Sequence, residues 1–236
     1  MKLLAFETAT EACSVAVWID GAVRERFEIA PRRHAELALP WAEQLLAEAG
    51  IAKSQLDAIA VGRGPGAFTG VRLAIAIAQG IALALDRPVV PVSTLATLAA
   101  AFPAPDGTSL RVLAAIDARM GEVYSAAFLR DGNGVTALSK ETVARPEAVV
   151  LADDAGDWRG VGTGFAASEG VLRQRLQARL ASVDATALPH AADVARLAAL
   201  AFARGEVLPP ERVEPAYLRD NVALTLVEQQ ALRDSR

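Results

Sequence analysis

The sequence predicts an α/β protein of two similar lobes, because one order of elements occurs twice along the chain. Each half begins with three expected strands and continues with a helix, a strand and a second helix. The hairpin-turn signals Asp20-Gly21 and Asp131-Gly132 each separate two apolar runs and lie about 110 residues apart. The Pro- and Gly-containing stretch 103–107 is the clearest linker. We therefore expect a first lobe over residues 1–105, a second lobe with a helical tail over residues 106–236, and a cleft between them.

In the first half, apolar runs and the residues that interrupt them locate the elements. Leu37, Trp41, Leu45 and Ala49 recur at four-residue spacing, which predicts a helix over 34–49 that ends at Gly50. A second helix is expected over 71–85, and a third begins at Ser93 as N-cap and runs to about residue 102. The apolar runs predict strands at 3–8, 14–19, 22–29, 56–61 and 88–92.

The second half repeats this order less cleanly. Three strands are expected at 110–116, 123–129 and 135–143, followed by a short helix at 145–151. A strand and turn at 160–164 precede two Ala- and Leu-rich helices at 170–181 and 191–204. The chain from residue 217 onward has the composition of a tail segment.

A glycine-dense turn joins the strand at 56–61 to the helix at 71–85. Four glycines between residues 62 and 70 leave little side chain between the backbone and whatever lies against it, and Thr69 is the expected N-cap. The turn could cradle an anion, admit a close partner, or simply connect strand to helix. It lacks the Gly-Lys-Ser/Thr of a P-loop, and Gly62-x-Gly64-x-x-Ala67 fits only a relaxed dinucleotide fingerprint.

Composition and charge limit the classes of function. The chain is 53% hydrophobic with a net charge of −4 and no run of lysine or arginine, so it is a poor candidate for binding RNA on its own. Its one cysteine, Cys13, allows no disulfide within the chain and predicts a buried, inert thiol. The N-terminus does not resemble a signal peptide, and the apolar stretch 71–85 is too short to span a bilayer. We expect a cytoplasmic protein without a membrane segment.

The helix over 71–85 is apolar in every direction around its axis, which predicts that it is buried on all sides. Its own sheet can cover one face only. The remaining face needs a neighbouring helix or another molecule, and the small residues Ala74, Ala78 and Gly80 would let a second helix approach closely.

Four stretches resemble the TsaB family, the bacterial partner proteins in making threonylcarbamoyladenosine in tRNA. The most specific, residues 64–72, is similar to the family's GPGSFTGLR, through Gly64, Pro65, Gly66, Phe68, Thr69, Gly70 and Arg72. Arg33-His34-Ala35-Glu36 resembles the family's His-Ser-Glu with alanine for serine, residues 116–124 its IDAR…EVY, and residues 215–219 its PxYLR. The matches cover nearly the whole chain.

The resemblance implies the two-lobed fold of actin, Hsp70 and the sugar kinases. In members that bind nucleotides, the turn after the first strand of each lobe holds phosphate; here Thr8, Thr10 and Arg119 are the candidate weak nucleotide contacts, and Glu11 would repel an anion. The catalytic TsaD relatives carry two histidines four residues apart for a metal; residue 38, four after His34, is alanine. We therefore expect neither a metal site nor a catalytic residue.

The resemblance also implies that the first two helices pair with a second copy or with TsaD. The expected interface consists of His34, Leu37, Trp41, Leu45, Val71, Ala74, Ile75, Ala78 and Ile81.

The leading hypothesis is a non-catalytic subunit that binds and activates a TsaD-type threonylcarbamoyltransferase. A TsaE-type ATPase would be a further partner, tRNA would be contacted only indirectly, the chain alone would be a homodimer, and ATP or ADP would bind only in the assembled complex. The alternative is a small-molecule or nucleotide-dependent phosphotransferase that uses the cleft. A peptidase has no supporting nucleophile or metal ligands in this sequence.

Overall fold

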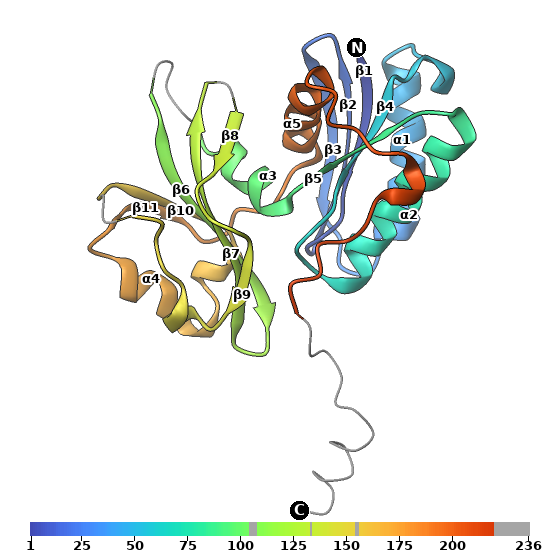
Figure 1. Ribbon diagram of the computed structural model, residues 1–236. Coiled ribbons are helices and arrows are strands. Elements are labelled where there is room, and N and C mark those ends of the chain that lie inside the picture. Colours follow the sequence, from blue (N-terminus) through green and yellow to red (C-terminus); the bar gives the residue numbers. More distant parts are fainter. Residues whose placement is uncertain (104–107, 133, 154–155, 220–236) are drawn as a thin grey trace, which may run out of the picture.

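Two mixed sheets form the centres of two lobes that lie side by side (Figure 1). The computed structural model describes residues 1–103, 108–132, 134–153 and 156–219. The first sheet has the strand order β3-β2-β1-β4-β5 and the second the order β11-β10-β6-β7-β8. The first sheet consists of β1 (Lys2–Glu7), β2 (Ala12–Ile19), β3 (Ala22–Ile29), β4 (Ala58–Gly62) and β5 (Val89–Val92). The second consists of β6 (Leu110–Arg119), β7 (Glu122–Asp131), β8 (Gly134–Ala137), β10 (Trp158–Val161) and β11 (Leu180–Asp184), with β9 (Thr142–Ala144) paired to β7.

The two sheets have the same internal plan. Strand β1 pairs antiparallel with β2 and parallel with β4, and β6 pairs antiparallel with β7 and parallel with β10. In each sheet, the three antiparallel strands are consecutive in sequence and form a meander (β1-β2-β3 and β6-β7-β8). The parallel strands of each sheet are joined by crossover connections. The predicted duplication and the two-lobed α/β class are confirmed.

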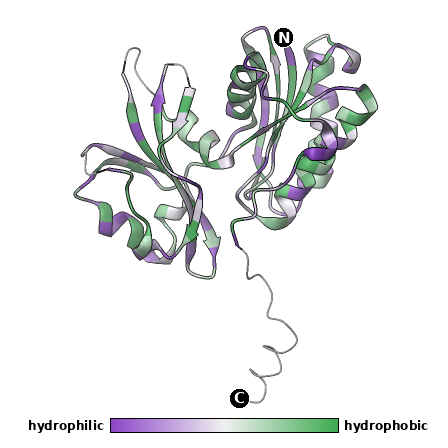
Figure 2. Cartoon of the chain, in the orientation of Figure 1, coloured by the Kyte–Doolittle hydropathy of each residue, from purple (hydrophilic) through white to green (hydrophobic). Residues whose placement is uncertain are grey.

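Helices cover both faces of the first sheet. Helices α1 (His34–Glu48) and α2 (Phe68–Leu85) share one apolar core with residues such as Phe6 and Ile59. Helix α5 (Ala191–Ala203) packs on the opposite face, against Leu3 and Ala58. Hydrophobic residues run along these helices as well as through the strands (Figure 2). Because side chains of a strand alternate between faces, this burial on both sides explains the nearly unbroken apolar runs of β1 and β4.

The packing divides the chain differently from the expected boundary at residues 105 and 106. Helix α3 (Thr94–Ala101) contributes Leu95 and Leu98 to the core of the second sheet, although it precedes the linker. Helix α5 follows the second sheet in sequence but returns to the first. The chain therefore crosses to the second lobe after β5 and returns to the first after β11. Apolar periodicity does not reveal this swap, because it cannot say which sheet a helix covers.

Three expected elements of the second half differ from the structure. The helix expected at 170–181 is the short α4 (Val171–Leu176) followed by strand β11. The strand expected at 135–143 is two strands, β8 and β9, which pair with different parts of β7. The helix expected at 145–151 is a single 3₁₀ turn at Pro146–Ala148. The final tail, residues 220–236, lies outside the described residues.

A polar cluster fastens the start of α5 to the edge of the first sheet. The Glu25 carboxylate accepts hydrogen bonds from Ser14 Oγ at 2.7 Å, from Ala192 N at 3.0 Å and from His190 Nδ1 at 3.0 Å. The His190 ring stacks on Phe27 with centroids 4.1 Å apart. The bond from Glu25 raises the pKa of His190; burial raises the pKa of Glu25, but the bonds from His190, Ser14 and Ala192 outweigh it and lower that pKa. The return crossing thus ends in an ion pair at a helix N-terminus.

Replacing His190 by Gln should lower thermal stability most near about pH 6 and less as the pH rises. A histidine whose folded pKa is raised stabilises the fold fully below its unfolded pKa, and this contribution is lost as the pH rises through the folded pKa. The test is to measure the melting temperatures of the wild type and of His190→Gln from about pH 6 upward. An equal difference between the two proteins at every pH would contradict the ion pair.

Candidate functional site

The glycine-dense loop seats the turn that follows β1. A Cβ atom placed on Gly70 would lie 2.0 Å from the Thr8 carbonyl oxygen, and one on Gly66 would lie 2.4 Å from the Ala9 carbonyl oxygen. Both distances are far inside van der Waals contact, so no larger residue fits at either position without movement of the backbone. The glycines therefore serve a close approach between two backbone segments of the same chain.

Hydrogen bonds tie the two segments together. Ala67 N donates to the Ala9 carbonyl oxygen at 2.7 Å, and Thr8 Oγ1 donates to the Gly70 carbonyl oxygen at 2.7 Å. The Gly64 carbonyl oxygen, next to the cis bond to Pro65, accepts from Thr94 N at 2.9 Å. The loop is thus fastened to two other backbone segments of its own chain.

The expected N-cap at Thr69 is wrong. Helix α2 begins at Phe68 with Ala67 as its N-cap residue, which makes no side-chain capping bond. Thr69 lies exposed in the first turn. The helix begins earlier because the bond from Ala67 N to the neighbouring turn, and the bond from Thr8 of that turn to the Gly70 carbonyl oxygen, already fix the backbone there.

Replacing Gly70 by Ala should lower the free energy of unfolding by roughly 2–4 kcal/mol, because the new methyl group would collide with the Thr8 carbonyl oxygen. The matched control is Gly80→Ala in the same helix, where a Cβ meets nothing within 4 Å. That change should stabilise by up to about 1 kcal/mol through helix propensity. Urea denaturation of both variants measures the difference, and equal effects would refute the close approach.

Glu7 is the last residue of β1, next to the contact between the glycine-dense loop and the turn after β1, and it is 1% exposed. Its carboxylate accepts from Ala9 N at 2.8 Å and from Thr94 Oγ1 at 3.1 Å, and lies so close to Gly62 that a Cβ there would be 2.0 Å from Oε2. Burial raises the pKa of Glu7 to about 7, although these hydrogen bonds partly oppose the shift. The carboxyl group therefore keeps its proton to a higher pH than an exposed glutamate does.

Replacing Glu7 by Gln should stabilise the protein above about pH 8 and leave its stability unchanged near pH 4. When folding raises the pKa of an acid from 4.5 to about 7, the protonated acid stabilises the folded state at low pH. This contribution to the free energy of unfolding is lost as the pH rises from 4.5 to about 7. The difference at high pH should be on the order of 3 kcal/mol. Denaturant titrations at several pH values test this, and a Gln variant that is less stable at high pH would contradict it.

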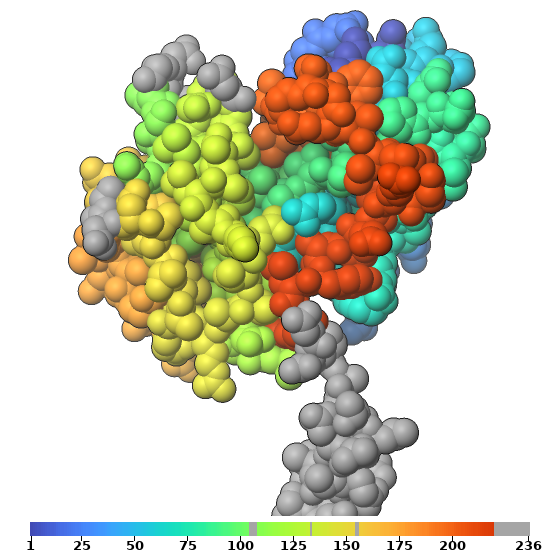
Figure 3. Space-filling model, in the orientation of Figure 1, coloured from blue at the N-terminus to red at the C-terminus, as the bar shows by residue number. Residues whose placement is uncertain are grey.

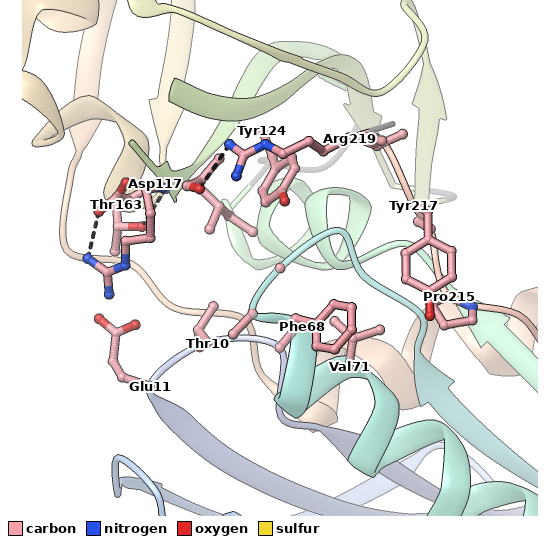
Figure 4. Close-up of a pocket in the computed structure, with 18 of the residues that line it drawn as sticks. Thr10, Glu11, Phe68, Val71, Asp117, Tyr124, Thr163, Pro215, Tyr217 and Arg219 are labelled. Carbon is pink, nitrogen blue, oxygen red and sulfur yellow. Dashed lines mark hydrogen bonds and ion pairs between the residues drawn. The ribbon is translucent and has the colours of Figure 1, made fainter. Parts of the chain in front are cut away.

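A cavity of about 490 Å³ lies between the lobes, beside the loop (Figure 4). Thr10 and Glu11 line it from the first lobe, and Asp117 and Arg119 from the second. The predicted contacts Thr10 and Arg119 are thus brought together, but Thr8 is fully buried and bonded to Gly70, which removes it from the cavity.

The charged groups of the second lobe at this cavity are already paired. Arg119 Nη1 donates to the Asp117 carboxylate at 2.8 Å, although the Arg119 side chain is 80% exposed. Arg219 forms an ion pair with Glu122 and donates to the Ala118 carbonyl oxygen at 3.3 Å.

The two histidines and the cysteine have structural surroundings. His34 Nε2 donates to the Thr10 carbonyl oxygen at 3.0 Å and to that of Ala12 at 3.2 Å, so it holds the first turn in place. His190 belongs to the cluster at α5. Burial raises the pKa of the fully buried Cys13 thiol to about 11. Within the described part of the chain, no group of three His, Cys, Asp or Glu side chains could hold a metal ion.

The expected partner surface is only partly available. Leu45, Val71, Ala74, Ile75 and Ala78 lie in the core of the first lobe, at most 5% exposed, because they face the sheet. Their assignment to a partner surface is wrong in this structure. Leu37, Trp41 and Ile81 pack on the edge of that core and are half-buried, and His34 is taken up by the turn.

The outer side of α2 is apolar and exposed. Leu83 is 62% exposed, and the small residues Ala76, Gly80 and Ala84 follow at four-residue spacing on the same side of the helix. The prediction that α2 is buried on all sides is therefore wrong for the single chain. By length and composition alone, the 18 residues of α2 could cross a membrane. The prediction that this stretch is too short to span a bilayer is therefore wrong, although the core helix of a soluble protein passes the same test.

The equivalent sheets and the cavity between them define a protein of the actin, Hsp70 and sugar-kinase class. A family model described as TsaD, tRNA N6-adenosine threonylcarbamoyltransferase, matches residues 27–226. The curated tRNA threonylcarbamoyladenosine biosynthesis protein TsaB of Escherichia coli is 45% identical over 227 residues, 94% of this chain and 96% of the relative. That of Haemophilus influenzae is 38% identical over 231 residues, 94% and 95% of the two chains. The chain belongs to the TsaB family.

A solved structure agrees with this assignment. A protein described as similar to peptidase YEAZ from Pseudomonas aeruginosa superimposes with a TM-score of 0.85 and 47% identity, covering 92% of this chain and 99% of that one. The sequence motifs that resemble the family lie together at the cavity, where α2 begins and where residues 215–219 pass.

Proposed function

We propose that this chain is a non-catalytic subunit in the biosynthesis of threonylcarbamoyladenosine in tRNA. In this role it binds and activates a TsaD-type threonylcarbamoyltransferase through its first-lobe helices. Full-length relatives that carry the TsaB name support the pathway. The observation that carries the pairing is the exposed apolar side of α2, with Leu83 beside the small residues Ala76 and Gly80.

The shape of this side fits another helix. Small residues at every fourth position give a shallow groove along α2, which lets a second helix approach closely and bury Leu83. On α1, Leu39 is 47% exposed and lines a small groove together with Ile81 of α2, which extends the apolar area onto α1. The C-terminal segment covers only the flank of α2, where Gln79 Nε2 donates to the Pro210 carbonyl oxygen at 2.8 Å.

The loop geometry supports a subunit without nucleotide chemistry of its own. The backbone groups of Ala67 and Gly70 bond the first turn, where a kinase of this fold class would place phosphate. In this proposal the chain is cytoplasmic and forms a homodimer when alone, and a TsaE-type ATPase joins the complex. The tRNA is contacted only indirectly, and ATP or ADP enters only in the assembled complex.

The test is gel filtration with light scattering on the chain alone and mixed with the TsaD homologue of its own genome. Leu83→Asp should weaken the heterodimer about tenfold or more, because a carboxylate would be desolvated in an apolar interface. The matched control is Ile29→Asp, at the end of β3, because Ile29 is 61% exposed and Leu83 is 62% exposed. The control should bind as the wild type does.

Two outcomes would count against the proposal. If neither substitution changes pairing, the partner does not use α2. If no complex forms and the isolated chain binds ATP saturably in a manner that depends on Thr10 or Arg119, the phosphotransferase alternative gains instead.

A further inference from the structure

Three large apolar side chains are exposed around the mouth of the inter-lobe cavity. Phe68 is 56% exposed, Tyr217 is 55% exposed and Met120 is 85% exposed. They come from the first turn of α2, the C-terminal segment and the turn between β6 and β7. Phe68 and Tyr217 line the cavity itself, and Met120 adjoins the lining residue Arg119. Segments far apart in sequence therefore place apolar surface on one rim.

Two arginines link these side chains into a continuous surface. The Arg72 guanidinium lies 3.5 Å above the Phe68 ring, and Arg72 Nε donates to the Tyr217 hydroxyl at 2.7 Å. Two residues further along the chain, Arg219 Nη1 contacts Met120 Sδ at 3.6 Å. The C-terminal segment therefore contacts both lobes, and Figure 3 shows it in orange-red beside them.

This rim is continuous with the exposed side of α2. Phe68, Arg72, Ala76 and Leu83 follow one another at spacings of four, four and seven residues, which places them on one side of a helix. A partner that lies along α2 and reaches its first turn therefore meets Phe68 and Arg72, and then the rim.

We propose that the rim formed by Phe68, Arg72, Tyr217 and Met120 is a second docking point for the protein that binds the exposed side of α2. This inference rests on the function proposed above. The rim has the composition of an interface centre, in which aromatic, methionine and arginine side chains are enriched. Methionine also adapts its shape to a partner. One partner would then contact both lobes and hold them in one relative position.

A protein partner fits this surface better than RNA does. Arginines that bind RNA must face the phosphates, but Arg72 is held by Tyr217 and Arg219 by Glu122. The chain also has a net charge of −4. Stacked aromatic and arginine groups without a surrounding excess of positive charge are typical of protein interfaces.

The test uses Met120, because it belongs to the second lobe. Met120 has a φ of 56°, which asparagine tolerates, so Met120→Asn removes the apolar side chain without backbone strain. The matched control is Val150→Asn, an apolar residue of the second lobe that is 78% exposed. Titration calorimetry with the TsaD homologue should show affinity reduced at least about fivefold for Met120→Asn and unchanged for Val150→Asn.

The outcomes separate this inference from the function on which it rests. If Met120→Asn binds like the wild type while Leu83→Asp does not, the rim is not a docking point and the α2 interface stands. If neither substitution affects binding, both fail. If Met120→Asn instead weakens binding of the isolated chain to its cognate tRNA, with affinity for the TsaD homologue unchanged, the rim is an RNA surface and the inference is overturned.

Discussion

The close approach of two backbone segments governs the first lobe. Gly66 and Gly70 lie against the carbonyl oxygens of Ala9 and Thr8 at distances that exclude any Cβ, and hydrogen bonds from Ala67 and Thr8 fix the contact. This contact sets where α2 begins and, through the bond between Gly64 and Thr94, where α3 begins. One constraint therefore fixes the loop, the first turn of α2 and the start of α3.

The two copies of the duplicated unit have diverged at equivalent turns. The turn after β1 is buried, with Thr8 bonded to Gly70 and the carboxyl of Glu7 enclosed beside Gly62. The turn after β6 instead projects outward, with positive φ at Arg119 and Met120 and with Met120 largely exposed. The first turn is therefore structural, whereas the second forms part of the surface.

Sequence reasoning succeeded where local chemistry decides the structure. It found the hairpin turn at Asp20, the Ser93 cap and the repeated element order, because turn and cap residues act on their own neighbours. It failed where nearly every residue is apolar. Along α2 the apolar residues do not mark one side of the helix, so the sequence could not distinguish the buried Ala74 and Ala78 from the exposed Ala76 and Gly80. Most of the residues predicted to form the partner surface therefore lie in the core. Only the packed sheet distinguishes the two sides.

The exposed side of α2 owes its fixed position to its buried side. Small residues there, such as Ala74 and Ala78, let the helix lie close on the first sheet, and the Thr8 bond to Gly70 holds its first turn. A helix anchored in this way has little freedom left to lose when a partner binds, which lowers the entropic cost of association. The glycine-rich contact therefore also makes the outer residues Ala76, Gly80 and Leu83 a rigid surface.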